Sequence, residues 1–194
     1  MYSSSFQTAT EALKNAHLQD PHIEFDGIDA VPAEWLYTRR LLERLRRIYP
    51  DASEALTIAA YCQHLHRWEI PRSDYPQGRA GYYQWRNYLS DYQAEKAVNI
   101  LKASGYTDDF ISEVTAILKK WNIGRMKEAQ KLEDAVCLVF LEHYMHDFMQ
   151  GKPDAKVVQI VQKTWNKMSE TARRAALELD LPAETRRIVS QALG

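Results

Sequence analysis

Every stretch of this chain with a clear hydrophobic period repeats at helical spacing, and none alternates convincingly as a strand would. Residues 135–141 read AVCLVFL and are apolar on every face of the helix that they predict. Such a helix needs neighbours all round, so we expect it at the centre of the domain. The pattern predicts an all-α fold in a single compact multi-helix domain. Within it we expect an N-terminal helix and connection over residues 1–31, a core over 32–180 and a C-terminal helix over 181–194.

Caps and chain breaks set the expected helix bounds. Proline suits a helix start, and Ser90 to Gln93 has the capping-box pattern that opens a new helix. We expect helices over residues 4–18, 33–49, 52–68, 81–89, 90–105, 107–121, 128–150, 154–168, 169–179 and 183–193. Residues 20–31 are expected to be a connection that returns over the body.

Composition excludes several classes of protein. A net charge of -1 argues against a protein devoted wholly to nucleic acid, which usually carries a basic excess. Cys62 and Cys137 each sit in an apolar helical run and are expected to be reduced core thiols. No apolar run has the length of a membrane span, and the N-terminus lacks the apolar segment of a signal peptide. We expect a soluble cytoplasmic protein with no membrane partner.

One stretch, residues 59–86, concentrates the side chains that could form a site. It holds six aromatic residues, four arginines and two histidines between proline-bracketed turns. Guanidinium groups match carboxylate and phosphate oxygens two at a time, so the stretch predicts a pocket for an anionic ligand. The predicted substrate-binding residues are Arg67, Trp68, Arg72, Tyr75, Arg79, Tyr82, Trp85 and Arg86. Alternatively, these arginines only tie an irregular loop to helix carbonyls, with the rings as cation–π partners.

His64, Glu133 and Asp134 are the candidate catalytic residues. An ionised Asp134 at the start of an all-apolar stretch must be paired, metal-bound or shifted in pKa. The alternative places Asp134 in a first helical turn, where the helix dipole favours a carboxylate. His64 interrupts a helix that is otherwise apolar, as a ligand-binding residue or as a hydrogen-bonded core histidine. His143 and His146 have the spacing of a metal pair, or belong to a solvated helix end.

Three segments carry a family resemblance: QHLHRWEIPRSDYPQGRAGYYQWR, LEDAVCLVFLEHY and KTWNKMSE. They closely resemble an uncharacterised bacterial and fungal family, domain-of-unknown-function family 4202. Some members carry a glutamyl-tRNA synthetase label, but a synthetase catalytic domain needs a nucleotide fold that these helices do not make. The chain is also remotely similar to HD-type metal-dependent phosphohydrolases. That likeness implies an HD-like helical arrangement, with Tyr37, Gln63, His64 and Asp134 in the places of the metal ligands.

The leading hypothesis is therefore an HD-like protein that binds an anionic or phosphorylated small molecule, with a nucleotide as one candidate. If it is an enzyme, one divalent metal ion held by His64 and Asp134 would activate water for phosphoester hydrolysis. The alternative is a non-catalytic module that binds RNA or a protein. In that case exposed arginines would contact phosphates while Trp68 and Trp85 stack on bases. Those arginines are Arg39, Arg40, Arg44, Arg46 and Arg47.

Overall fold

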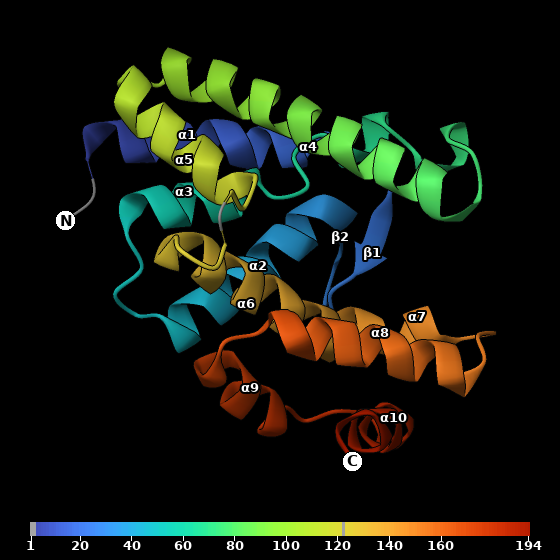
Figure 1. Ribbon diagram of the computed structural model, residues 1–194. Helices are drawn as coiled ribbons and strands as arrows, with labels where there is room; N and C mark the ends of the chain where they lie inside the picture. Colours follow the sequence, from blue (N-terminus) through green and yellow to red (C-terminus); the bar gives the residue numbers. More distant parts are fainter. Residues whose placement is uncertain (1–2, 122) are drawn as a thin grey trace.

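The computed structural model describes residues 3–121 and 123–194, and it confirms the all-α prediction apart from one short hairpin. The elements are α1 (Ser4–His17), β1 (Ile23–Phe25), β2 (Ala30–Pro32), α2 (Ala33–Ile48), α3 (Glu54–Cys62), η1 (Arg67–Glu69), η2 (Arg72–Asp74), α4 (Gly78–Ala103), α5 (Asp108–Leu118), α6 (Lys127–Val139), η3 (Phe140–Tyr144), α7 (Met145–Met149), α8 (Asp154–Lys167), α9 (Glu170–Leu177) and α10 (Ala183–Leu193). Helices α1, α3, α4 and α5 lie on one side of α2 and α6, and α8, α9 and α10 lie on the other (Figure 1). None of the helices in the described ranges is long and apolar enough to cross a membrane.

Buried side chains form two clusters, and α6 contributes to both. Ala135 and Val139 belong to the cluster built with α1 to α5. Leu138 and Leu141 belong to the cluster built with α8, α9 and α10. The stretch over residues 135–141 is therefore packed on all sides at the centre of the domain, as predicted, because each of its faces serves a different cluster.

Both cysteines lie in the core without a disulfide, in agreement with the prediction of core thiols. Cys62 is fully buried and Cys137 nearly so. Burial raises the pKa of each thiol to about 12, so neither is a reactive thiolate near neutral pH.

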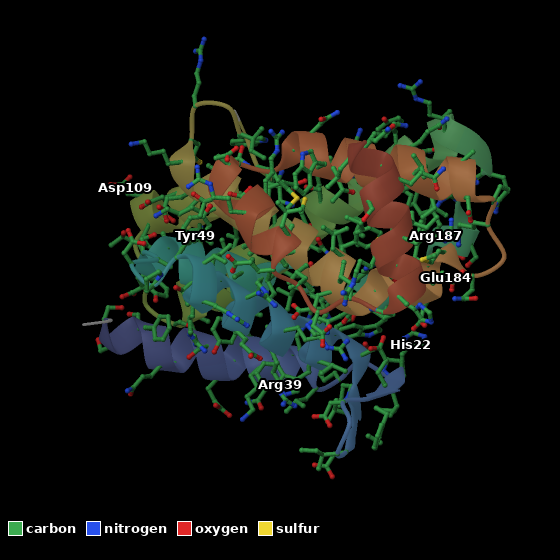
Figure 2. The ribbon with its side chains drawn as sticks, turned by 90° about the horizontal axis from the view of Figure 1, so that it is seen from below. His22, Arg39, Tyr49, Asp109, Glu184 and Arg187 are labelled. Carbon is green, nitrogen blue, oxygen red and sulfur yellow. The ribbon has the colours of Figure 1, made fainter. Side chains whose placement is uncertain are left out.

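The connection over residues 20–31 contains an antiparallel hairpin that the sequence did not predict. Its register pairs Ile23 with Pro32 and Phe25 with Ala30. The Asp26 carboxylate accepts hydrogen bonds from the backbone N–H groups of Ile28 and Asp29 and so closes the turn. Strands of three residues are too short to show an alternating period, which is why the pattern was missed. Figure 2 shows the hairpin projecting from the body near Arg39.

The helix predicted over residues 52–68 ends early, at Cys62. Ser53 caps its start, accepting a hydrogen bond from the Leu56 N–H at 3.1 Å. Beyond Cys62 the backbone leaves the helical region, and η1 follows only at Arg67. The expectation that His64 lies on a helix face is therefore wrong, because contacts to other elements fix it in a turn.

The predicted break near Ser90 is also wrong, since α4 runs unbroken for 26 residues. Its buried side is a continuous stripe at every fourth position: Gly81, Trp85, Leu89, Gln93, Ala97 and Leu101. This stripe keeps the helix packed through the capping-box pattern, so tertiary burial overrides the local signal.

The helix predicted over residues 128–150 contains a turn of π-helix, η3, between α6 and α7. A π turn inserts an extra residue and shifts the register of the helix beyond it, and such turns are frequent at functional sites. Here it directs Glu142 and Tyr144 toward α2, where they contact Arg44 and Arg40.

Candidate functional site

Two histidines in the turn after α3 adopt left-handed backbone conformations. The φ angle is 61° at His64 and 53° at His66. A residue other than glycine in the left-handed backbone region costs about 1 kcal/mol or more, so the surrounding contacts must offset that strain. Residues held in such conformations cluster at functional sites, which directs attention to the contacts that hold His64.

Two side chains near the start of α2 contact the His64 imidazole, one through a carboxylate and one through an aromatic ring. His64 Nδ1 lies 3.0 Å from Glu34 Oε2. The ring of Tyr37 stacks on the imidazole with centroids 4.0 Å apart and planes 19° apart. Glu34 and Tyr37 are three residues apart on one helix face, so a single rigid element fixes both contacts.

Arg67 also contacts the imidazole. Its Nη1 lies 3.2 Å from Nδ1 and 3.4 Å from Nε2, within hydrogen-bond reach of both ring nitrogens. The same guanidinium lies 5.6 Å from the centroid of the Trp85 ring. Trp85 is fixed in turn, because its Nε1–H donates to the Ile70 carbonyl at 2.8 Å.

The π turn extends this arrangement on its other side. The ring of Tyr144 lies 5.8 Å from that of Tyr37, and Arg40 donates from Nη1 to the Tyr144 hydroxyl at 3.0 Å. Arg40 also lies 3.6 Å from Glu24 of the hairpin. We call this chain of contacts the His64 stack, and its members in order are Trp85, Arg67, His64, Tyr37, Tyr144 and Arg40.

Burial and neighbouring charges set the protonation states in the stack. Burial lowers the pKa of His64, Glu34 opposes this shift, and Arg67 adds to it. Burial alone would raise the pKa of Glu34, but the attraction of His64, its hydrogen bond and the charge of Arg67 outweigh it and lower the pKa. A neutral His64 therefore donates from Nδ1 to an ionised Glu34, and the lone pair of its Nε2 faces Arg67 Nη1 at 3.4 Å.

The Tyr37 hydroxyl is a buried donor that has no hydrogen-bond partner among the described residues. Tyr37 is only 7% exposed, and burial raises its pKa far above the usual range, so it keeps its proton. An unpaired buried hydroxyl costs about 1–3 kcal/mol. This donor sits beside His64 and has an unused hydrogen bond to offer.

Asp134 is not part of the stack. Its side chain is fully buried in the middle of α6, so the first-turn alternative is wrong. One oxygen accepts from the Tyr49 and Ser169 hydroxyls at 2.6 Å each, and the other accepts from Gln130 at 2.9 Å and the Ser169 N–H at 2.8 Å. Ser169 caps α9, so Asp134 fastens α9 to α6.

Glu133 is paired with two lysines. It lies between Lys120 and Lys167, and the second ion pair measures 3.3 Å. Burial would raise its pKa, but the two ammonium groups lower the pKa to about 2. A carboxylate held this way is a poor proton donor or acceptor near neutral pH, so the structure favours a structural role over the predicted catalytic one.

A metal shared by His64 and Asp134, as the phosphohydrolase resemblance implies, does not fit these residues. Both Asp134 oxygens are already occupied by donors, and Tyr37 lies flat on His64. Within residues 3–121 and 123–194, no group of three or more His, Cys, Asp or Glu side chains is placed to hold a metal ion. We therefore derive no chemical step through a metal at this site.

Of the residues predicted to bind a ligand, Arg67 and Trp85 join the stack, and the others do not. Arg72 donates to the carbonyls of Tyr75 and Pro76, at 2.9 and 2.8 Å, so it ties the loop as the alternative interpretation held. Trp68 packs beside His66, with ring centroids 5.1 Å apart. The remaining four lie on the outer side of the loop and of α4: Tyr75, Arg79, Tyr82 and Arg86.

The arginine face of α2, considered for RNA, is largely paired. Arg39 bonds Asp26 at 3.0 Å, Arg40 contacts Glu24, and Arg44 is buried against Glu142. Arg46 and Arg47 are exposed and form no ion pair within the described ranges. Most of this face is thus committed to holding the hairpin and the π turn.

Sequence reasoning missed Glu34, Arg40 and Tyr144. Glu34 carried a usable signal, since it shares a helix face with Tyr37, three residues later. Tyr144 carried none, because the π turn that aims it at Arg40 cannot be read from an apolar helical period.

Comparison with known proteins gives a family without a function. A family model described as a domain of unknown function (DUF4202) matches residues 7–189. Neither a curated protein nor a solved structure matches the chain. The HD-like arrangement expected from the sequence therefore has no structural counterpart to support it.

Proposed function

Because the chain belongs to this family of unknown function, DUF4202, we propose from the site itself that the protein binds a small anionic molecule, such as a phosphorylated metabolite, at Arg67 beside His64. The observation that carries the proposal is the position of Arg67. Its guanidinium contacts the rings of His64 and Trp85 and pairs with no carboxylate among residues 3–121 and 123–194. A half-buried guanidinium that no carboxylate of the described residues contacts directly has strong donors to offer, and oxyanions are the groups that match them.

The neighbours of Arg67 support an oxyanion in that place. The Tyr37 hydroxyl is a buried donor without an acceptor in the described part of the chain, and Lys120 adds positive charge near His64. The rings of Tyr37, His64 and Trp85 are locked by α2 and α4, so little conformational entropy would be lost on binding. Donors held before binding are what an anion site requires.

If the bound molecule reacts, the group equipped for chemistry is His64. Glu34 orients the imidazole through Nδ1, and Nε2, 3.4 Å from Arg67 Nη1, is the nitrogen that would accept a proton, as in a carboxylate–histidine pair in general base catalysis. The depressed pKa of His64 keeps this nitrogen unprotonated at neutral pH. The step proposed here is proton abstraction from a nucleophile, with Arg67 holding the anionic group.

Calorimetric titration with a panel of anions tests the proposal. The panel comprises phosphate, pyrophosphate, sugar phosphates, and nucleoside mono- and triphosphates. We expect at least one to bind saturably to the wild type, and Arg67→Ala to weaken it by about tenfold or more. Arg47→Ala is the matched control, since Arg47 is exposed and unpaired on α2. Binding that survives Arg67→Ala, or no binding by any member, would overturn the proposal.

A further inference from the structure

The first turns of α4 present an exposed face of two arginines and two tyrosines. Arg79, Tyr82, Tyr83 and Arg86 follow the spacing i, i+3, i+4 and i+7, so they share one side of the helix. Tyr82 is 40% exposed and Tyr83 is 48% exposed. The face lies away from the buried stripe that begins at Gly81.

The four side chains contact one another rather than the body. Arg79 lies 5.6 Å from the ring centroid of Tyr83, and Arg86 Nη1 is 3.5 Å from the Tyr82 hydroxyl. The two tyrosine rings are 5.7 Å apart, and Tyr82 also touches Trp85. Neither arginine pairs with a carboxylate anywhere in the described part of the chain, so both positive charges remain available.

The helix that carries this face is held rigidly at its start. Gly81 approaches so closely that an added Cβ would lie 1.9 Å from the Pro76 carbonyl oxygen. Arg72 fixes that carbonyl, and Trp85 is anchored to the Ile70 carbonyl. Rigid aromatic side chains on a fixed backbone lose little entropy when they bind a partner.

The charge of the segment selects the partner. Residues 75–90 contain Arg79 and Arg86 but no Asp or Glu. A polyanion is therefore the favoured partner. The exposed tyrosine rings favour a polyanion that also carries planar groups, spaced like its charges. Single-stranded nucleic acid supplies both, since its phosphates pair with arginine and its bases stack on tyrosine whatever the sequence.

We infer that the Arg79–Tyr82–Tyr83–Arg86 face of α4 is a docking surface for single-stranded nucleic acid. The surface meets the His64 stack at Trp85, which Tyr82 contacts, but it does not require the ligand proposed for Arg67. An acidic protein segment would also meet the arginines, but it would gain little from the tyrosine rings.

Fluorescence anisotropy with labelled oligouridylate and oligothymidylate tests the inference on the full chain. We expect binding at about 50 mM salt that weakens toward about 200 mM. Tyr82→Ala with Tyr83→Ala should weaken it by about tenfold or more, through lost stacking. Arg79→Ala with Arg86→Ala should reduce the slope of log affinity against log salt by about 0.7 for each arginine removed. Preference for the RNA over the DNA strand would identify the source of the ligand.

Two control variants separate this face from other surfaces. Tyr88 is 52% exposed on the opposite side of α4, where it contacts Tyr75 and Tyr92, so Tyr88→Ala should leave affinity unchanged. Arg47→Ala on α2 should also have little effect. No binding at low salt, equal losses in the controls, or polyglutamate binding to the wild type as tight as that of the oligonucleotides would overturn the inference.

Discussion

The Tyr37 hydroxyl should have opposite effects on stability and on binding. It is buried without a hydrogen-bond partner among the described residues, so Tyr37→Phe removes an unsatisfied donor and keeps the ring that stacks on His64. We expect the free energy of unfolding to rise by about 1 kcal/mol. The affinity for the anion that Arg67 binds should fall. Urea denaturation and calorimetry on the same variant measure both, and a loss of stability would show that the hydroxyl has a partner.

Asp134 should behave as a structural residue. Asp134→Ala leaves the two Ser169 donors, the Tyr49 hydroxyl and Gln130 without their acceptor, and it loosens α9. We expect a loss of about 3 kcal/mol in urea denaturation. Ser169→Ala keeps the carboxylate and should cost about 1 kcal/mol. A loss below about 1 kcal/mol for Asp134→Ala would return the carboxylate to the candidates for chemistry.

His17 makes stability depend on pH. It is fully buried, with Nε2 2.8 Å from the Tyr61 carbonyl, and burial lowers its pKa below 6.5. The unfolded chain then binds a proton that the folded chain does not, so stability is complete above pH 6.5 and falls below it. His17→Gln keeps an N–H donor and should reduce this fall by up to about 1.4 kcal/mol per pH unit. An unchanged slope in denaturation between pH 7 and pH 5.5 would contradict the assignment.

At the scale of single residues, the sequence placed His64, Arg67 and Trp85 among the candidates for one site, and in the structure Arg67 contacts the rings of the other two. The sequence could not show that Asp134 lies outside this site. A buried carboxylate has the same sequence pattern whether it binds a metal or accepts four hydrogen bonds. Arg72 was equally ambiguous, since backbone carbonyls that satisfy a guanidinium leave no trace in the sequence.

At the scale of elements, helices with an amphipathic period that begin directly after a proline were predicted almost to the residue. Examples are α2 and α10, whose expected ranges of 33–49 and 183–193 meet the observed ones. The errors lie where tertiary contacts override a local signal. His64 lies outside α3, in a turn held by contacts with Glu34 and Tyr37. The buried stripe keeps α4 helical through Ser90, where the sequence predicted that a new helix begins.

The start of α4 should be sensitive to one methyl group. In Gly81→Ala the new Cβ meets the Pro76 carbonyl, which is backbone that Arg72 holds in place. We expect a loss of about 2 kcal/mol from overpacking. Gly124→Ala is the matched control, because nothing lies within 4 Å of its added Cβ, and it should stay within about 0.5 kcal/mol of wild type. Equal melting temperatures for the two variants would contradict the close approach.

At the scale of the whole molecule, α6 should make the two core clusters unfold together. Leu132 is fully buried in one cluster and Leu138 in the other. Leu132→Ala and Leu138→Ala should each cost about 2–5 kcal/mol while unfolding remains a single transition. Hydrogen exchange reads this out by segment. If α8–α10 opened in Leu138→Ala while α1–α5 stayed protected, the two clusters would be independent units.

The most direct test of the anion site is the pKa of the His64 imidazole, measured by NMR with and without saturating pyrophosphate. In the free protein we expect a value below 6.5, because burial and Arg67 disfavour the charged ring. A bound anion beside the ring should raise that pKa in the wild type and leave it unchanged in Arg67→Ala. A free value at or above 6.5 would contradict the neutral imidazole on which the account rests. Pyrophosphate binding that leaves the pKa of His64 unchanged would place the anion elsewhere and contradict the central claim.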